Sequence, residues 1–319
     1  MKTTSASMAT INDIPSQEQL IQTIDPSALY PGSESSLSWS GLGLGFLRLD
    51  LVHPTVSGNK WFKLKHNLQY AIDMGYKSVL TFGGAYSNHL HATAAAAREY
   101  GLKATGLVRG MYASVNLTPT LAACKDLGME IVFVPREEYS RKDDPEYLRQ
   151  LEEQYPNSFI IPEGGANDQG RAGAEEIATL VPDSYSHVCV SVGSGTTFIR
   201  LRNGLHHSQS LLGFVPLRGG SYLKSHIRNH LYHDKDNHWI LFDDYHFGGF
   251  GSSTDELIDF MNSFYNRTSI PLDIVYTSKM MFGIRELLRS GFFPSGSRIL
   301  CVHTGGLQGN VSVKDKLAF

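Results

Sequence analysis

Residues 58–65 read Gly58-Asn59-Lys60-Trp61-Phe62-Lys63-Leu64-Lys65. A glycine–asparagine turn here opens a helix, because apolar residues recur at helical spacing at Trp61, Leu64, Leu68 and Ile72. The pattern predicts a helix over 60–74 with those four side chains buried. Lys60 falls in its first turn, where the helix dipole disfavours a cation, and Lys63 lies one turn further on. Both effects are expected to lower the pKa of the Lys60 amine and to suit it to covalent bonding with an aldehyde. Three solvated lysines on an amphipathic helix are the alternative.

The composition is that of a globular chain with a large core. The 319 residues allow one large domain or two of ordinary size, and 41% of them are hydrophobic against 18% charged. The formal net charge of −3 and the lack of a long basic run argue against nucleic acid as the main partner. No apolar stretch of the sequence approaches the ~20 residues that span a bilayer, so no membrane partner is expected.

The N-terminus and the cysteines bear on the cellular compartment. Residues 1–14 begin with a serine- and threonine-rich run and lack the apolar core of a signal peptide, so we expect a flexible leader. Cys124, Cys189 and Cys301 are widely spaced and odd in number, which is typical of reduced, buried cysteines. A cytoplasmic protein is expected.

Short apolar runs alternate with helical patterns along most of the chain. Strands are expected at 45–52, 78–82, 105–109, 130–134, 158–161, 187–192, 239–242 and 298–303. Helices are expected at 60–74, 89–100, 117–127, 145–154, 171–181, 254–264 and 279–289, with one more after 197. Strands that alternate with helices predict an α/β fold, with a parallel sheet covered by helices on both faces. The region 203–240 is more polar and rich in histidine.

Unusual residues collect where apolar strands run into helices, which is where open parallel sheets bind their ligands. The run 193–197, Gly-Ser-Gly-Thr-Thr, follows one strand, and its glycines, N–H groups and hydroxyls suit a phosphate. A purely structural turn is the alternative. Ser87 follows another strand as a good N-cap residue, and Ser87-Asn88-His89 can present donors to a carboxylate. Tyr276 precedes a third helix, and from its position alone simple packing in the core is favoured.

The histidine-rich segment carries a weaker signal. His226, His230 and His233 have the spacing of metal ligands on a helix. No acidic or cysteine partner is evident in the sequence beside them and the segment is polar, so a solvated helix is favoured and no metal is expected. The same interpretation applies to His206 and His207.

Taken in order, these motifs resemble a known family. They are Ser57-Gly58-Asn59-Lys60-Trp61-Phe62-Lys63-Leu64, Phe82-Gly83-Gly84-Ala85-Tyr86-Ser87-Asn88-His89, Ile161-Pro162-Glu163-Gly164-Gly165, Val192-Gly193-Ser194-Gly195-Thr196, Val275-Tyr276-Thr277 and His303-Thr304-Gly305-Gly306. From about Leu47 to Gly306 the chain is similar to the pyridoxal-phosphate enzymes of the 1-aminocyclopropane-1-carboxylate deaminase and D-cysteine desulfhydrase family.

The resemblance implies the tryptophan-synthase-β-like fold, also called fold type II. It has two domains, each an open, mostly parallel twisted sheet with helices on both faces, and the cofactor lies in the cleft between them. The larger, cofactor-binding domain would comprise 15–68 and 163–319, and the smaller α/β domain 69–162.

The resemblance also implies that pyridoxal 5′-phosphate is the cofactor and predicts the residues that bind it. These are Asn59, Lys60, Lys63, Asn88, Gly193, Ser194, Gly195, Thr196, Thr197, Tyr276 and Thr277. Lys60 would bond covalently to the cofactor, and Lys63 with the loop 193–197 would hold the phosphate. Asn88 would touch the pyridine ring or its 3-oxygen. Tyr276 would stack near the ring, and Thr277 would meet the ring nitrogen.

By the same resemblance, the substrate would lie against Ser87, Asn88, His89, Gly165 and Phe250, the first three cradling its carboxylate. Lys60, Ser87 and Tyr276 would be the catalytic residues.

Two positions depart from the family pattern. The deaminases have a glutamate where this chain has Thr277, and a hydroxyl keeps the ring nitrogen protonated less well than a carboxylate does. Phe250 takes the place of a second active-site tyrosine and has no hydroxyl for acid–base chemistry. A divergent substrate is therefore expected.

These features together predict a pyridoxal-phosphate-dependent lyase or deaminase acting on a small amino acid. The favoured reaction is an α,β-elimination like that of D-cysteine desulfhydrase, giving a keto acid and ammonia. The alternatives are 1-aminocyclopropane-1-carboxylate deamination or amino-acid racemisation on the same cofactor, and a non-catalytic phosphate-ligand-binding protein. The resemblance also implies a homodimer.

Overall fold

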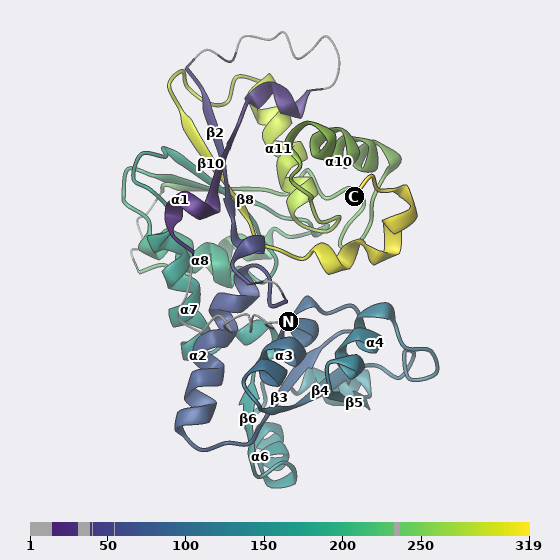
Figure 1. Cartoon of the computed structure of the whole chain (residues 1–319). Helices are drawn as coiled ribbons and strands as arrows, with labels where there is room; N and C mark the ends of the chain where they lie inside the picture. Colours follow the sequence, from purple (N-terminus) through teal and green to yellow (C-terminus); the bar gives the residue numbers. More distant parts are fainter. Residues whose placement is uncertain (1–14, 31–38, 40, 54, 233–236) are drawn as a thin grey trace, which may run out of the picture.

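Two separate sheets form the framework, which the computed structural model describes over residues 15–30, 39, 41–53, 55–232 and 237–319 (Figure 1). The larger sheet has the strand order β1-β2-β10-β7-β8-β9. Its strands are β1 (Ile21–Ile24), β2 (Gly43–Arg48), β7 (His187–Ser191), β8 (Ser210–Phe214), β9 (Trp239–Phe242) and β10 (Arg298–His303). The smaller sheet has the order β5-β4-β3-β6, with β3 (Ser78–Gly83), β4 (Lys103–Arg109), β5 (Met129–Val134) and β6 (Ser158–Ile161).

Strand pairing is parallel in both sheets except at one edge. All three pairs of the smaller sheet are parallel, and so are the pairs that β10 makes with β2 and β7. Only β1, among the described strands, runs antiparallel to its neighbour, with Ile21 opposite Leu47. The prediction of two open, mostly parallel sheets in an α/β fold is therefore confirmed.

Helices cover both faces of each sheet, as Figure 1 shows. The longer ones are α2 (Asn59–Asp73), α3 (Asn88–Glu99), α4 (Pro119–Asp126), α6 (Pro145–Gln154), α7 (Asp168–Thr179), α8 (Thr196–Gly204), α10 (Asp255–Thr268) and α11 (Thr277–Arg289). The short ones are α1 (Gln17–Leu20), α5 (Arg136–Ser140) and α9 (Tyr222–Arg228). Helix α2 begins between the two sheets, extends along one side of the smaller sheet and packs against α7 (Figure 1). The contact is close, because a Cβ at Gly173 would lie 1.8 Å from the Phe62 carbonyl oxygen.

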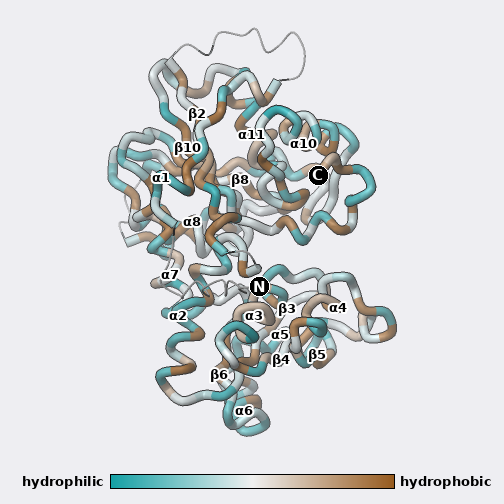
Figure 2. Tube along the Cα trace, viewed as in Figure 1, coloured by the Kyte–Doolittle hydropathy of each residue, from teal (hydrophilic) through white to brown (hydrophobic). Residues whose placement is uncertain are grey.

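The alternation of side chains along the strands builds two cores on the larger sheet. In β10, Leu300 and Val302 join the core beneath α7 and α8, whereas Ile299 and Cys301 point to the core beneath α10 and α11. Strands buried on both faces read as continuous apolar runs, which is why these were visible in the sequence. Figure 2 shows the result, with apolar colour in the strands and polar colour along α6.

Two strands were missing from the sequence prediction. β8 lies within the region interpreted as polar and has only five residues, one of them a glycine. β1 is an edge strand of four residues near the N-terminus. The other predicted strands and helices are present, although β2 starts earlier than expected and ends at Arg48, where a 3₁₀ turn, η3 (Leu49–Leu51), follows.

The predicted buried face of α2 needs a correction. Trp61, Leu64 and Leu68 are buried, but Ile72 is 39% exposed. Lys63 and Lys65 are buried instead, at 2% and 8% exposure. The reason is that α2 is covered on more than one side, by α7 and by the smaller sheet, so its lysine side chains lie inside the protein. The alternative of solvated lysines is wrong for these two positions.

The remaining predictions concern the cysteines, the leader, a membrane partner and the domain limits. Cys124, Cys189 and Cys301 are buried free thiols, as predicted. The proposed leader 1–14 and His233 lie outside the described residues. None of the helices in the described ranges is long and apolar enough to cross a membrane. The domain limits at 68 and 162 stay a prediction, although the two sheets fall on either side of them.

Candidate active site

The first turn of α2 is fixed by the turn that follows β10. Gly58, the N-cap, has φ +77°, and a Cβ there would lie 2.0 Å from the Thr304 carbonyl oxygen. Only glycine allows this approach. The N–H of Asn59 then donates to the same Thr304 carbonyl at 3.2 Å. Lys60 is thereby held at the end of the larger sheet where β10 terminates.

Burial makes Lys60 and Lys63 unusually weak bases. Burial lowers the pKa of Lys60 to about 8, and its Nζ donates to the Asn59 side-chain oxygen at 3.4 Å. Burial also holds the pKa of Lys63 well below its usual range, and the nearby charge of Lys60 lowers it further. The predicted lowering for Lys60 is confirmed in direction. The cause is desolvation by burial, which the sequence did not predict.

The run 193–197 forms the N-terminal entry to α8. Gly195, the N-cap of α8, is left-handed at φ +88°, and the first backbone N–H groups of a helix have no partner within it. The Asn59 amide donates to the Thr197 hydroxyl at 2.9 Å, and the hydroxyls of Ser194 and Thr196 are 3.2 Å apart. The amine of Lys60 therefore lies next to a helix N-terminus that is suited to an anion.

The N-terminus of α3 supplies a second set of donors. The Ser87 hydroxyl caps the helix by accepting from the N–H of Leu90 at 3.3 Å, as predicted. A Cβ at Gly306 would lie 3.2 Å from Nδ2 of Asn88, so the smaller sheet reaches the larger one here. The N-terminus of α3 thus faces the turn after β10.

His89 is placed differently from its two neighbours. Its ring is buried, with Nε2 2.9 Å from the hydroxyl of Thr81, which itself donates to the Ile161 carbonyl. Burial and the charges of Lys60 and Lys63 lower the pKa of His89 to about 3. The imidazole is therefore neutral and turned toward β3, so only the backbone of His89 is available to a substrate carboxylate.

Tyr276 closes the other side of the 193–197 turn. A Cβ at Gly193 would lie 3.4 Å from the Tyr276 ring, and the Ser191 hydroxyl donates to the Tyr276 carbonyl at 2.9 Å. Burial and the charge of Asp273 raise the pKa of the Tyr276 phenol. The tyrosine is thus a neutral hydroxyl beside the loop and not a core residue.

Phe250 lies over Tyr276 on a tightly held loop. The two rings meet edge to face with their centres 5.7 Å apart, and Phe250 is 57% exposed. Lys279, itself buried, donates to the carbonyls of His246 and Gly249 at 2.9 and 2.8 Å and so fixes the loop. Phe250 therefore presents an apolar surface at the rim of the site.

The remaining predicted residues are distributed around this centre. Gly165 packs against α2, where a Cβ would lie 3.2 Å from Cβ of Lys63. Thr277 is fully buried, and its hydroxyl hydrogen bonds to Asp273. The residues of the six motifs thus lie at the turns after β3, β6, β7 and β10 and in the first turns of α2, α3, α8 and α11.

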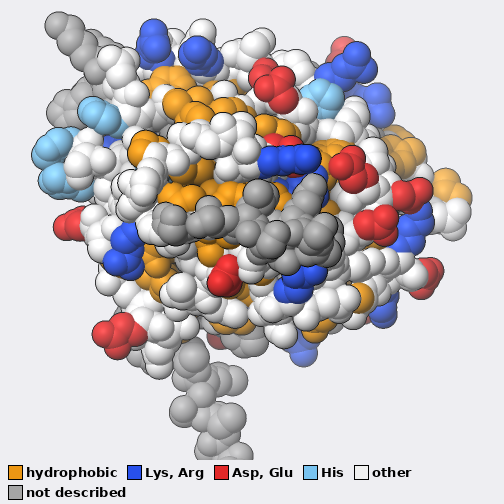
Figure 3. Space-filling model, turned by 90° about the horizontal axis from the view of Figure 1, so that it is seen from above, with side chains coloured by type: hydrophobic (Ala, Val, Ile, Leu, Met, Phe, Trp, Pro, Cys, Tyr) orange, Lys and Arg blue, Asp and Glu red, His pale blue; other side chains and the backbone are white. Residues whose placement is uncertain are grey.

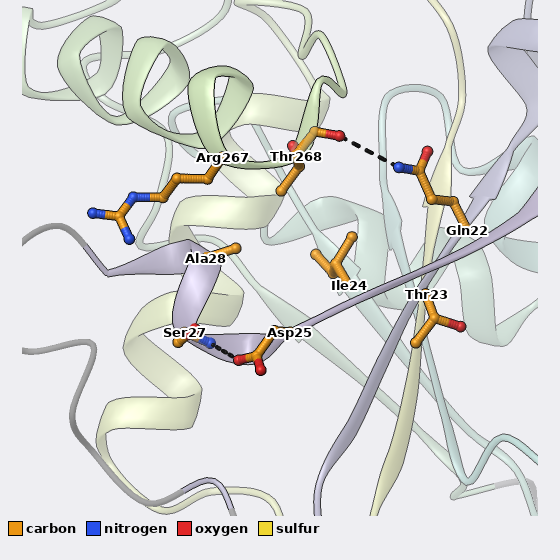
Figure 4. A pocket seen from close by; sticks show the side chains of 8 residues that line it. All are labelled: Gln22, Thr23, Ile24, Asp25, Ser27, Ala28, Arg267 and Thr268. Atoms are coloured by element: carbon orange, nitrogen blue, oxygen red, sulfur yellow. Dashed lines mark hydrogen bonds between the residues drawn. The ribbon is translucent and has the colours of Figure 1, made fainter.

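Two further features lie outside this centre, a group of exposed histidines and a surface hollow. His206, His207 and His230 are exposed. Figure 3 draws one face of the molecule, and histidine side chains gather at one edge of it. Within the described residues, no group of three His, Cys, Asp or Glu side chains could hold a metal ion. A hollow of about 350 Å³ lies between β1, the 3₁₀ turn Pro26–Leu29 and the end of α10 (Figure 4). None of the predicted site residues lines it.

Sequence reasoning missed two residues of the site, Asp273 and Lys279. Asp273 lies in a short apolar run and gives no signal of its own, because its role depends on the backbone turn that starts α11. Lys279 lies on the apolar face of α11 and appears as one more helix lysine, since its two carbonyl partners come from a loop 30 and 33 residues earlier.

The arrangement suits a phosphate ester that carries an aldehyde. The weakly basic amine of Lys60 can bond to the aldehyde, and the N-terminus of α8 with Lys63 can hold the phosphate. The loop packs against the Tyr276 ring, from which a Cβ at Gly193 would lie 3.4 Å away. These are the requirements of pyridoxal 5′-phosphate.

Comparison with known proteins identifies the class. A family model described as "Pyridoxal-phosphate dependent enzyme" matches residues 40–305, and the chain belongs to this family. It is therefore an enzyme that uses pyridoxal 5′-phosphate, which sets aside the non-catalytic alternative.

The curated relatives point to one branch of the family, and the chain is a lyase or deaminase of this kind. It is 30% identical over 285 residues to a putative 1-aminocyclopropane-1-carboxylate deaminase of Pyrococcus horikoshii, covering 85% of this chain and 86% of the relative. It is 27% identical to a bifunctional D-cysteine desulfhydrase/1-aminocyclopropane-1-carboxylate deaminase, mitochondrial, of Arabidopsis thaliana, covering 88% and 76%. A crystal structure of an ACC deaminase homologue matches with a TM-score of 0.76 and 27% identity over 93% of this chain and 91% of the other.

Proposed function

We propose that this enzyme catalyses α,β-elimination on a small amino acid, with D-cysteine as the first candidate. D-Cysteine and water would give pyruvate, hydrogen sulfide and ammonia. The observation that carries the proposal is the Lys60 amine, which burial makes weakly basic and which lies beside the α8 N-terminus through the Asn59–Thr197 hydrogen bond. The D-cysteine desulfhydrase named among its relatives suggests the substrate.

Most of the predicted residues then have a part in the reaction or in binding. Lys60 holds the cofactor covalently and, when its amine is free, takes the α-proton of the substrate at Nζ. Lys63 and the loop 193–197 bind the phosphate. Ser87 and Asn88, at the N-terminus of α3, bind the substrate carboxylate together with the backbone N–H of His89.

The remaining groups shape the site and supply protons. Pyridoxal 5′-phosphate supplies the electron sink for the charge left when the α-carbon loses its proton. The Tyr276 phenol is neutral, so it can donate a proton to a leaving group. Phe250 and Gly165 bound the space for the substrate side chain, and Phe250 makes that space apolar on one side.

A panel of D- and L-amino acids, with 1-aminocyclopropane-1-carboxylate included, tests the proposal. Keto acid, ammonia and sulfide are measured, and the mass of the product separates elimination from ring opening and from racemisation. D-Cysteine is expected to give all three products. Turnover of 1-aminocyclopropane-1-carboxylate alone, or racemisation without ammonia, would contradict the proposed reaction.

The Lys60→Ala variant tests the role of Lys60 directly, and Lys65→Ala is the matched control. Lys65 lies on the same helix but pairs with Glu176, away from the site. Lys60→Ala should lose both the absorbance near ~420 nm of a protonated cofactor–lysine bond and the activity. Lys65→Ala should keep both.

Three further features are proposals. The family resemblance supports a homodimer and domain limits at residues 68 and 162, and the cysteines support a cytoplasmic location. The buried free thiols suit a reducing compartment. Light scattering of the purified holoenzyme tests the assembly, and a mass close to one chain of 35.3 kDa would exclude the dimer.

A further inference from the structure

The turn after β10 supports the first turn of α2. Its Thr304 carbonyl accepts the N–H of Asn59, the residue before Lys60, at 3.2 Å. The next two residues, Gly305 and Gly306, are left-handed at φ +78° and +96° and carry no side chain that could anchor them. The position of the turn, and with it the position of Lys60, therefore depends on the groups that bind the backbone of the turn.

His303, the last residue of β10, binds this backbone through Nδ1 of its fully buried ring. The N–H of Gly305 donates to Nδ1 at 3.2 Å, and Nε2 lies 2.7 Å from the Pro271 carbonyl oxygen. A carbonyl oxygen only accepts hydrogen bonds, so the ring proton is on Nε2, and Nδ1 keeps a lone pair for Gly305. The two contacts together define a neutral imidazole in a single tautomer.

A buried ion pair lies beside the same ring nitrogen. Oδ1 of Asp50 is 3.4 Å from Nδ1 of His303, so a charged imidazolium would donate to this carboxylate and release the N–H of Gly305. Arg48 already binds Asp50, donating from Nε and Nη2 at 2.8 and 2.7 Å, and its third nitrogen donates to Gln22. This two-pronged pair neutralises the carboxylate, which leaves the imidazole uncharged and available to the turn.

We propose that His303 is a positioning residue for Lys60. Its unprotonated Nδ1 holds the N–H of Gly305, and the turn then presents the Thr304 carbonyl to the first turn of α2. The inference rests on the proposed role of Lys60 as the residue that bonds to the cofactor. It adds that the position of this lysine depends on the tautomer of a histidine that acts through backbone groups.

Close packing around the turn passes any shift of its backbone to both sides of the site. A Cβ at Gly58, the N-cap of α2, would lie 2.0 Å from the Thr304 carbonyl oxygen. On the other flank, a Cβ at Gly306 would lie 3.2 Å from Nδ2 of Asn88, at the start of α3. Interiors packed this closely transmit displacements. Loss of the contact to Nδ1 is therefore expected to weaken cofactor binding.

Two substitutions separate the roles of the two ring nitrogens. In His303→Asn the side-chain oxygen can replace Nδ1 and accept the N–H of Gly305, whereas the donor to Pro271 is lost. In His303→Gln the terminal amide can replace Nε2 and donate to Pro271, whereas the acceptor for Gly305 is lost. Each variant keeps one of the two hydrogen bonds, so a role in stability alone predicts similar behaviour for both.

Absorbance titration of the cofactor-free enzyme measures the affinity for pyridoxal 5′-phosphate, and urea denaturation measures stability. We expect His303→Asn to bind the cofactor within about twofold of wild type, and His303→Gln to bind it about fivefold more weakly, the factor that one hydrogen bond contributes. The free energy of unfolding should fall in both variants. Equal affinities for the two variants, or weaker binding by His303→Asn, would overturn the inference.

The wild-type enzyme provides an independent measurement. Long-range ¹H–¹⁵N nuclear magnetic resonance of histidine-labelled holoenzyme, assigned with either variant, reports which nitrogen of His303 carries the proton. A proton on Nε2 alone is expected, and a proton on Nδ1 would overturn the inference. In that case a cofactor bond at Lys60 and keto acid formed from substrate would leave the proposed function intact. Absence of that bond in the wild type would instead refute the proposed function.

Discussion

The side-chain amide of Asn59 donates a 2.9 Å hydrogen bond to the hydroxyl of Thr197, and this contact joins the first turns of α2 and α8. The residue after Asn59 is the lysine with the lowered pKa, and the residues before Thr197 form the glycine turn. The hydrogen bond therefore sets the spacing between the group that would bond to the cofactor aldehyde and the groups that would hold its phosphate.

Removing this hydrogen bond should weaken cofactor binding. We expect Asn59→Ala to bind pyridoxal 5′-phosphate about fivefold more weakly, since one hydrogen bond contributes roughly 1 kcal/mol. Titration of cofactor-free enzyme, followed by absorbance, measures the change. Gln69→Ala is the control, because Gln69 lies on the same helix and donates a hydrogen bond to Asp73 on the surface. Equal affinities for the two variants would show that the contact has no part in binding.

The lowered pKa of Lys60 predicts a pH dependence for the reaction of cofactor-free enzyme with pyridoxal 5′-phosphate. Only the neutral amine attacks an aldehyde, and with a pKa of about 8 the neutral fraction rises roughly tenfold between pH 7 and 9. The rate should rise over this range and then level off. Stopped-flow absorbance measures it. A rate that kept rising to pH 10 would indicate a lysine of ordinary pKa.

The turn at Gly58 should tolerate no side chain. Gly58→Ala would place a Cβ 2.0 Å from the Thr304 carbonyl and force a left-handed alanine, so we expect a loss of about 3 kcal/mol or more in the free energy of unfolding. Gly75→Ala separates the two effects. Gly75 is also left-handed, at φ +81°, but has open space around it, and should lose only about 1 kcal/mol. Urea denaturation compares them, and similar losses would refute the close approach.

Introducing a hydroxyl at position 250 should raise the reaction rate without changing the fold. Phe250 is exposed and its ring lies beside Tyr276, so Phe250→Tyr adds a donor at the rim of the site. A positioned proton donor contributes about a hundredfold or more to a reaction rate. We expect kcat for D-cysteine to rise by about tenfold at least, with the melting temperature unchanged. Unchanged kcat with every amino acid of the panel would show that Phe250 does not face the substrate.

The sequence alone predicted most of this framework for a physical reason. Strands such as β10 are buried on both faces and helices such as α6 begin at a clear N-cap, so local pattern and final structure agree. The motif residues could be placed because parallel sheets gather the ends of their strands at one edge.

What the sequence could not give were properties that arise from burial and from distant partners. The depth of Lys63 depends on α7, more than a hundred residues later, and the cause of the Lys60 pKa shift follows from the same burial. The ring of His89 turns toward β3 because Thr81 offers a partner there, although its sequence neighbours face the site. Asp273 and Lys279 act through backbone groups, which have no signature in the sequence.

The central claim is that Lys60 is the residue that bonds to the cofactor. Borohydride reduction of the holoenzyme would make that bond permanent, and mass spectrometry of the digested protein would locate the pyridoxyl group. Lys63 and Lys279 also have lowered pKa values caused by burial, so they are real competitors. The account predicts the label on Lys60. A label on Lys63, on Lys279 or on no lysine of the chain would contradict it.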